Sequence, residues 1–107
     1  MGTKIVMKDI RPKRRMPWSI GKTISVKTKS PFFLIVEYET GEKRILDLEG
    51  FIENDSNLLP LKTEMGLFEK AEISLCGYMT EWMYNGYNCY FHNDIVFVYG
   101  DDYIEND

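Results

Sequence analysis

Histidine and cysteine, the side chains that most often bind zinc or act as nucleophiles, are scarce in this 107-residue chain, which holds one histidine and two cysteines. A structural zinc site needs four ligands, whereas His92, Cys76 and Cys89 supply three and lack CxxC or HxxxH spacing. A phosphate-cradling glycine loop, a GxSxG motif and a metal-histidine motif are also missing. We therefore expect no metal, no cofactor and no catalytic residues, so the chain is not predicted to be an enzyme.

Long apolar runs are missing as well. No stretch reaches the roughly 18–20 apolar residues that a membrane span needs, and residues 1–15 lack the apolar centre of a secretory signal. The sequence thus predicts a cytoplasmic protein without a membrane span. In that compartment the two cysteines are expected to be reduced core residues rather than a disulfide.

The composition that is present is typical of a folded globular chain. Hydrophobic residues make up 44%, charged residues 28% and aromatic residues 14% of the sequence, which is enough apolar surface to offset the entropy lost on ordering. Aromatic side chains bury roughly 150–250 Å² each, so they should dominate the core. A chain of this length is expected to form a single domain over residues 1–107.

Charge is distributed unevenly along the chain. Residues 1–30 hold nine Lys or Arg and one acid, a local charge of +8, whereas residues 31–107 hold four Lys or Arg and sixteen acids, a local charge of −12. We divide the domain into a basic N-terminal segment (1–30), an acidic α+β body (31–100) and a frayed acidic tail (101–107). The basic segment is either an arm that contacts nucleic acid or an acidic partner, or a segment that packs on the acidic body.

Alternation of polar and apolar residues predicts strands over residues 3–10, 22–29 and 32–39. The first strand is followed by an irregular basic loop, because Pro12 and Pro17 exclude a helix interior and remove ladder donors.

A tight turn at Gly41 joins the strand over residues 32–39 to another over 43–48, so this pair is predicted to be an antiparallel β-hairpin. Residues 49–61 contain acids, asparagines and a few apolar groups, and should form a loop or an irregular helical turn pinned to the core. Residues 63–71 have apolar residues at helical spacing and predict one short helix.

The last third of the sequence is predicted to be a three-stranded meander. Asn85-Gly86 is a strong hairpin signal because both residues tolerate positive φ, and Asn93-Asp94 is a second pair of this kind. Strands are therefore expected before Asn85, over residues 87–92 and over the β-prone run 95–99. The fold class is α+β, mostly antiparallel β-sheet with one short helix.

A catalytic role for His92 would need Cys89 as nucleophile and Glu81 or Asp94 as orienting carboxylate. Cys89 and His92 lie three residues apart, so on one strand they point to opposite faces. This geometry favours a structural histidine beside the predicted turn. A buried Cys89 would have a thiol with a raised pKa and would be inert.

Four segments follow one another between Phe32 and Tyr99: the apolar strand FFLIVEY, then TGEKRILDLEGFI, then LLPLKTEMGLFEKAEIS, and finally the tryptophan strand TEWMYNG. In this order the chain resembles an uncharacterised bacterial family known as domain of unknown function 2442. The resemblance implies a small α+β domain of unknown activity, similar to modules fused to helix-turn-helix repressors or placed beside toxin–antitoxin-like genes. It implies no catalytic residues.

The sequence thus favours a non-catalytic protein-interaction module, an accessory or regulatory domain of such a toxin–antitoxin-like or transcriptional system. The candidate partner-binding residues are aromatic residues of the predicted meander, a residue class enriched in interface hot spots: Trp82, Tyr84, Tyr87 and Tyr90. The partner is another protein or a second copy of the chain, which would make a homodimer.

Nucleic-acid contact through the basic segment is the alternative function. Lysine and arginine neutralise phosphates, and an exposed tryptophan can stack on a base. The candidate residues for contact with nucleic acid or an acidic partner are Arg11, Lys13, Arg14, Arg15 and Trp18, with Lys8 and Lys22 nearby. No helix-turn-helix, zinc-finger or RNA-recognition signature accompanies them, and the acidic body would repel the same polymer.

Overall fold

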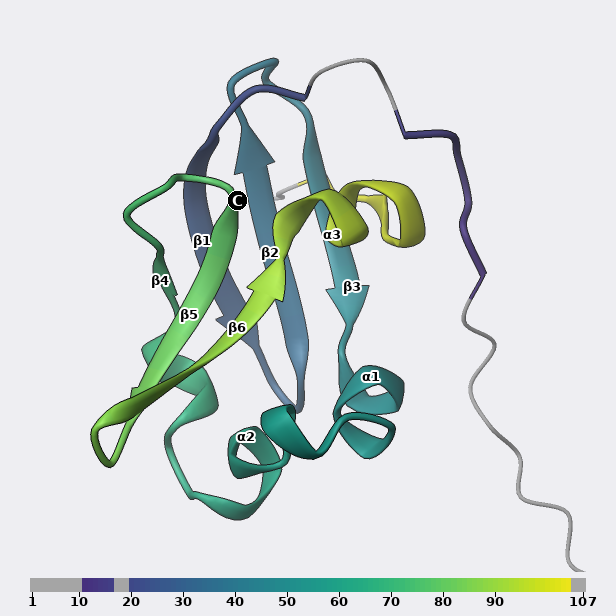
Figure 1. The fold of residues 1–107 in the computed structure, drawn as a ribbon. Coiled ribbons are helices and arrows are strands. Elements are labelled where there is room, and N and C mark those ends of the chain that lie inside the picture. Colours follow the sequence, from purple (N-terminus) through teal and green to yellow (C-terminus); the bar gives the residue numbers. More distant parts are fainter. Residues whose placement is uncertain (1–10, 17–19, 105–107) are drawn as a thin grey trace, which may run out of the picture.

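The computed structural model describes residues 11–16 and 20–104 (Figure 1). The strand predicted over residues 3–10 lies outside these residues, as do Lys8 and Trp18. Two antiparallel sheets are combined with short helices, so the predicted α+β class with mostly strand content is confirmed.

The elements follow a simple order along the described part of the chain. They are β1 (Thr23–Lys29), β2 (Phe33–Tyr38), β3 (Lys43–Asp47), α1 (Glu49–Glu53), η1 (Ser56–Leu58), α2 (Pro60–Thr63), η2 (Phe68–Lys70), β4 (Glu72–Ile73), β5 (Met79–Tyr84), β6 (Tyr87–His92), α3 (Asn93–Tyr99) and β7 (Asp101–Asp102). The η elements are single 3₁₀ turns.

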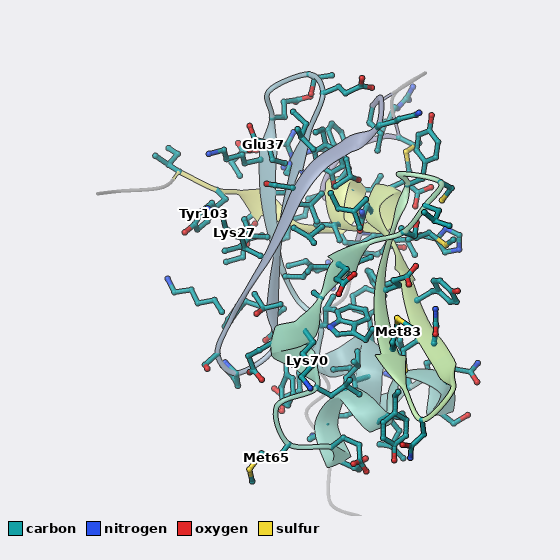
Figure 2. All side chains as sticks on the ribbon, turned by 90° about the vertical axis from the view of Figure 1, so that its left-hand side faces the viewer. Lys27, Glu37, Met65, Lys70, Met83 and Tyr103 are labelled. Atoms are coloured by element: carbon teal, nitrogen blue, oxygen red, sulfur yellow. The ribbon has the colours of Figure 1, made fainter. Side chains whose placement is uncertain are left out.

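The first sheet has the order β1-β2-β3-β7, and all neighbouring strands are antiparallel. The predicted hairpin of β2 and β3 is confirmed. Alternation along β2 directs Leu34, Val36 and Tyr38 into the core, where each is fully buried. The other face of this sheet is turned outward, and Figure 2 shows Lys27 and Glu37 projecting from it.

The second sheet has the order β4-β5-β6 and is also antiparallel. Its β5–β6 hairpin turns at Asn85-Gly86, where φ is 47° and 86°, so the turn predicted at this pair is confirmed. In the described part of the chain β6 pairs with β5 alone and is therefore an edge strand.

The core lies between the two sheets, which face each other in Figure 1. Trp82 and Phe91 from the second sheet pack in the same cluster as the buried residues of β2. The helical turns contribute Ile52 and Leu58, and α3 contributes Val96. Each fully buried aliphatic or aromatic side chain stabilises the fold by roughly 1.5–3 kcal/mol.

The strand predicted over residues 95–99 is wrong, because this segment belongs to α3. The reversal predicted at Asn93-Asp94 is wrong too, since Asn85 is the one non-glycine residue of the described chain with positive φ. Asn93 instead begins the helix, and its N–H donates to the Tyr78 carbonyl at 3.0 Å. The third strand of the second sheet is β4, which precedes β5.

The single helix predicted over residues 63–71 is wrong in extent. α2 begins at Pro60, a residue suited to the first helical turn, and ends at Thr63. Glu64 is extended and Gly66 has a φ of 84°, so the helix does not continue, and η2 forms a separate turn. Irregular helical turns are present over residues 49–61 as α1 and η1, as expected.

Among the residues described, no helix has the length and hydropathy to cross a membrane.

The tail predicted to fray from residue 101 begins with a strand instead. Asp101 and Asp102 of β7 pair with Ile45 and Arg44 of β3. Gly100 allows this close return of the chain, because a Cβ at that position would lie 2.6 Å from the Val96 carbonyl oxygen and 2.8 Å from that of Ile45.

Candidate protein-interaction site

Trp82 belongs to the core, so its assignment as a partner-binding residue is wrong. The side chain is 0% exposed, and its indole Nε1 donates a hydrogen bond to the Phe68 carbonyl at 2.8 Å. The two rings stack with centroids 5.8 Å apart. Tyr84 is half-buried against the same core. The side chain of Tyr87 lies outside the described part of the structure.

Tyr90 lies on the outer face of the second sheet and is 47% exposed. Met83, which is 65% exposed, is its diagonal neighbour, because Glu81 lies opposite Tyr90 and Met83 opposite Asn88. The Asn88 side-chain amide donates to Glu81 Oε2 at 3.2 Å and to the Tyr90 hydroxyl at 3.1 Å. These bonds hold the tyrosine ring beside Met83, which projects from the sheet in Figure 2.

A groove lies between β6 and the helical turns of residues 50–60. Figure 1 shows α1 and α2 of this region on the side of β6 away from β5. Its wider part is a hollow of about 520 Å³, lined by Asp55, Ser56, Asn57, Pro60, Asn88, Cys89, Tyr90 and His92. An adjoining hollow of about 280 Å³ shares three of these residues and is otherwise lined by Gly50, Phe51, Asn54, Leu58, Phe91 and Ile95. We call the two hollows together the β6 groove.

Asp55 lies where the two hollows meet. Its backbone is extended, and its Oδ1 accepts a hydrogen bond from the Asn57 N–H at 2.9 Å, which caps η1 and positions the carboxylate. The pKa of the Cys89 thiol is raised, first by burial and then by the negative charge of Asp55. Asp55 is not among the candidates from the sequence, although aspartate ahead of Ser-Asn-Leu is a recognisable capping signal.

Cys89 and His92 both line the groove but point to opposite faces of β6, as their spacing predicts. Cys89 is 2% exposed and belongs to the core, whereas His92 is exposed on the outer face. Because burial raises the pKa of the thiol, the nucleophilic thiolate is disfavoured. In the described residues no group of three or more His, Cys, Asp or Glu is arranged to hold a metal ion.

Cys76 is not the core residue that the sequence predicts, because it is exposed in the turn between β4 and β5. Its Sγ lies 3.1 Å from Ser74 Oγ and accepts a hydrogen bond from the Tyr78 N–H at 3.4 Å. Both bonds lower the pKa of the Cys76 thiol, and the bond with Ser74 has the larger effect. Both cysteines are free, and Cys76 does not line the β6 groove.

Lys13 attaches residues 11–16 of the basic segment to the acidic end of the body, where β7 contributes Asp101 and Asp102. The backbone N–H of Lys13 donates a hydrogen bond to the Val98 carbonyl at 2.7 Å, and its side-chain Nζ lies 2.5 Å from Asp101 Oδ1. The position of Lys13 therefore supports packing on the body rather than a free arm. Arg11 and Arg15 are exposed, and Trp18 lies outside the described residues.

Arg14 attaches the same segment to the end of α3. Its guanidinium donates to the carbonyls of Phe97 and Gly100, the latter at 2.8 Å, and lies 3.6 Å from Asp102 Oδ1. The two carbonyls belong to the end of α3, where a cation is favoured by the unpaired carbonyl groups and the helix dipole. Arg14 thus caps α3. Its guanidinium is occupied by these contacts and would have to leave them to bind phosphate.

Arg44 brings a second guanidinium to the same region from the inner face of β3. It is 6% exposed, and its Cζ lies 4.4 Å from the centroid of the Phe97 ring. It pairs with Glu42 at 2.9 Å and with Asp102 at 3.0 Å. The pKa of the Glu42 carboxyl is lowered, mainly by a hydrogen bond from Thr40 and to a smaller extent by the hydrogen bond and charge of Arg44. The buried guanidinium of Arg44 thus joins β3, α3 and β7 through one buried ring and two exposed carboxylates, and has a structural role.

Comparisons of the chain with protein-family models, with curated proteins and with solved structures find no match.

Proposed function

We propose that this chain is a non-catalytic protein-interaction module, with the outer face of β5–β6 and the β6 groove as its contact surface. The observation that supports this most is an edge strand, β6, that borders an open groove in the described part of the chain. Edge strands with free backbone groups are ready sites for pairing with another chain. Next to this edge, Met83 and Tyr90 expose apolar surface, and tyrosine is enriched in interface hot spots.

The chemistry of the thiols supports binding rather than catalysis. The cysteine in the groove, Cys89, has a raised thiol pKa, and the cysteine with a lowered pKa, Cys76, lies outside the groove. A nucleophile and its base need to lie within hydrogen-bond reach of each other. The only histidine, His92, faces away from Cys89.

The biological setting stays a prediction from the resemblance to domain of unknown function 2442. On that basis we place the module in the bacterial cytoplasm, as an accessory or regulatory domain of a toxin–antitoxin-like or transcriptional system. The partner is another protein or a second copy of the chain. Nucleic-acid contact has less support, because Lys13 and Arg14 are engaged with Asp101, Asp102 and the end of α3.

Site-specific photo-crosslinking in cells tests the interaction surface. A photoreactive amino acid at Tyr90 should give a discrete crosslinked product, whereas the same amino acid at Lys27, on the outer face of the first sheet, should not (Figure 2). Met83→Arg should weaken the product formed at position 90, because a charge replaces apolar contact surface. Equal products from both positions, or a product unchanged by Met83→Arg, would contradict the proposal.

A further inference from the structure

The register of the β5–β6 hairpin determines which backbone groups of β6 face away from β5. A two-residue turn with positive φ at both positions closes on a hydrogen-bonded pair, here Tyr84 and Tyr87. Since hydrogen-bonded and non-hydrogen-bonded pairs alternate, Asn88 and Tyr90 occupy non-hydrogen-bonded pairs. The backbone N–H and C=O groups of these two residues therefore point to the free edge. The backbone N–H of His92 points the same way.

This free edge opens on the β6 groove. Asn88, Tyr90 and His92 all line the wider hollow, and within the described residues no strand lies next to them on that side. A row of donors and acceptors of this kind is a template for a further strand, which would lie about 4.8 Å away. The hollow of about 520 Å³ falls in the range of roughly 300–1,000 Å³ that is typical of ligand sites.

The groove offers two kinds of side-chain contact to such a strand. The narrower hollow presents apolar surface, from Phe51, Leu58, Phe91 and Ile95. Where the two hollows meet, Asp55 presents a carboxylate. Side chains at positions i and i+2 of a strand point the same way about 7 Å apart, so an apolar residue and a basic residue at that spacing would reach both.

We infer that β6 binds an extended peptide segment of another protein by strand addition, with an apolar side chain in the narrower hollow and a lysine or arginine against Asp55. This inference rests on the proposed interaction function and specifies the chemistry of the partner. Charge complementarity supports it, because residues 31–107 carry sixteen acids and four Lys or Arg.

A second copy of the chain is the poorer occupant. β6 reads Tyr-Asn-Cys-Tyr-Phe-His and so has no lysine or arginine to place against Asp55. Pairing two β6 edges would also bring two acidic bodies together, and like charges repel. Size-exclusion chromatography with light scattering should therefore show a monomer. A dimer that Tyr90→Arg dissociates would assign the edge to a second copy and overturn the inference.

An NMR titration of the ¹⁵N-labelled full chain tests strand addition directly. The probe is a short acetylated peptide of alternating threonine and valine, with one leucine and one lysine two positions apart. We expect the largest amide shifts at Asn88, Tyr90 and His92, and slower hydrogen exchange of their backbone N–H groups because these become hydrogen-bonded.

Two further peptides carry N-methyl groups, each on one of the two alternating sets of residues. The set that faces β6 should weaken binding at least tenfold, and the other set should not.

Asp55→Asn separates the charge contact from the fold. Asparagine caps a helical turn as well as aspartate does, so η1 should persist while the charge is lost. The lysine peptide should bind this variant about threefold more weakly, as expected for an exposed ion pair. A peptide with norleucine in place of lysine should bind both proteins equally. Glu69→Gln, which removes an exposed acid outside the groove, should change neither affinity.

Equal binding of the two N-methylated peptides, shifts confined to other parts of the chain, or no binding up to millimolar peptide would each overturn strand addition. These results are distinct from failure of the interaction function. A crosslinked partner at position 90 together with failure of the peptides would leave the interaction function standing and remove strand addition alone.

Discussion

At the scale of single residues, Asn93 determines how the two sheets and α3 meet. It is 1% exposed, and its side-chain amide accepts from Thr80 Oγ1 at 2.7 Å and donates to Thr23 Oγ1 at 2.8 Å. The backbone carbonyl oxygen of Asn93 accepts a hydrogen bond from the Tyr38 hydroxyl at 2.5 Å. Burial raises the pKa of Tyr38 well above its usual value, so the phenol remains a neutral donor. One buried asparagine therefore links β1, β2 and β5 to the start of α3.

Asn93→Ala should lower the free energy of unfolding by about 2–3 kcal/mol, because the hydroxyls of Thr80 and Thr23 are left buried without this partner. Urea unfolding followed by circular dichroism measures the change. Asn57→Ala serves as the control, since that residue is exposed and uses only its backbone N–H in the Asp55 cap. It should change stability by less than about 0.5 kcal/mol. Equal effects of the two substitutions would show that Asn93 has no special role.

At the scale of elements, α3 shows how tertiary contacts decide the conformation of an apolar run. Residues 95–99 are apolar and β-prone, and such a run fits a buried strand or a buried helix. As a helix it buries Val96, Phe97 and Val98 and contacts strands of both sheets, which a strand at the border of one sheet could not do. The hydrogen bonds of Asn93 and the cap supplied by Arg14 stabilise its two ends.

Gly100→Ala tests the close return of the chain from α3 to β7. Because the added Cβ would lie within 3 Å of the carbonyl oxygens of Val96 and Ile45, we expect a loss of about 1–3 kcal/mol in the free energy of unfolding. Thermal unfolding of Gly100→Ala and of Lys70→Ala, an exposed control on η2, gives the comparison. A melting temperature of Gly100→Ala that equals that of the control would rule out this steric contact.

At the scale of the whole molecule, the uneven charge is partly compensated by contact. Residues 1–30 carry a local charge of +8 and residues 31–107 one of −12. Within the described residues 11–16, Lys13 and Arg14 pair with Asp101 and Asp102 and so offset part of this difference. Ion pairs at the surface each contribute about 0–1 kcal/mol, so these two position residues 11–16 more than they stabilise the fold.

Fluorescence polarisation with short DNA and RNA tests whether this segment contacts nucleic acid. We expect no binding at low salt, since two of the cationic groups are engaged and the body repels phosphate. Arg15→Ala, at an exposed cation of the segment, provides the comparison. Binding that falls steeply with salt and is weakened by Arg15→Ala would instead favour the nucleic-acid alternative.

The candidate site could be predicted from the sequence only in part. Period-two alternation on β5 and β6 separates Trp82 from Met83 and Cys89 from Tyr90, but it does not say which face is buried. Trp82 is inside because η2 covers that face and supplies the carbonyl of Phe68 to its indole. Asp55 reaches the groove through the path of the chain between β3 and β4, which no local pattern reveals.

By itself the sequence determined the hairpins of β2–β3 and β5–β6, the mostly antiparallel sheet and the separation of charge, because these depend on alternation, turn residues and composition over a few neighbouring positions. Only the tertiary structure decided that residues 93–99 form a helix, that Asp101 and Asp102 form a strand, that Lys13 and Arg14 pack on the acidic end, and that β6 borders a groove. Each of these depends on contacts between distant segments, whose free energies outweigh local preference.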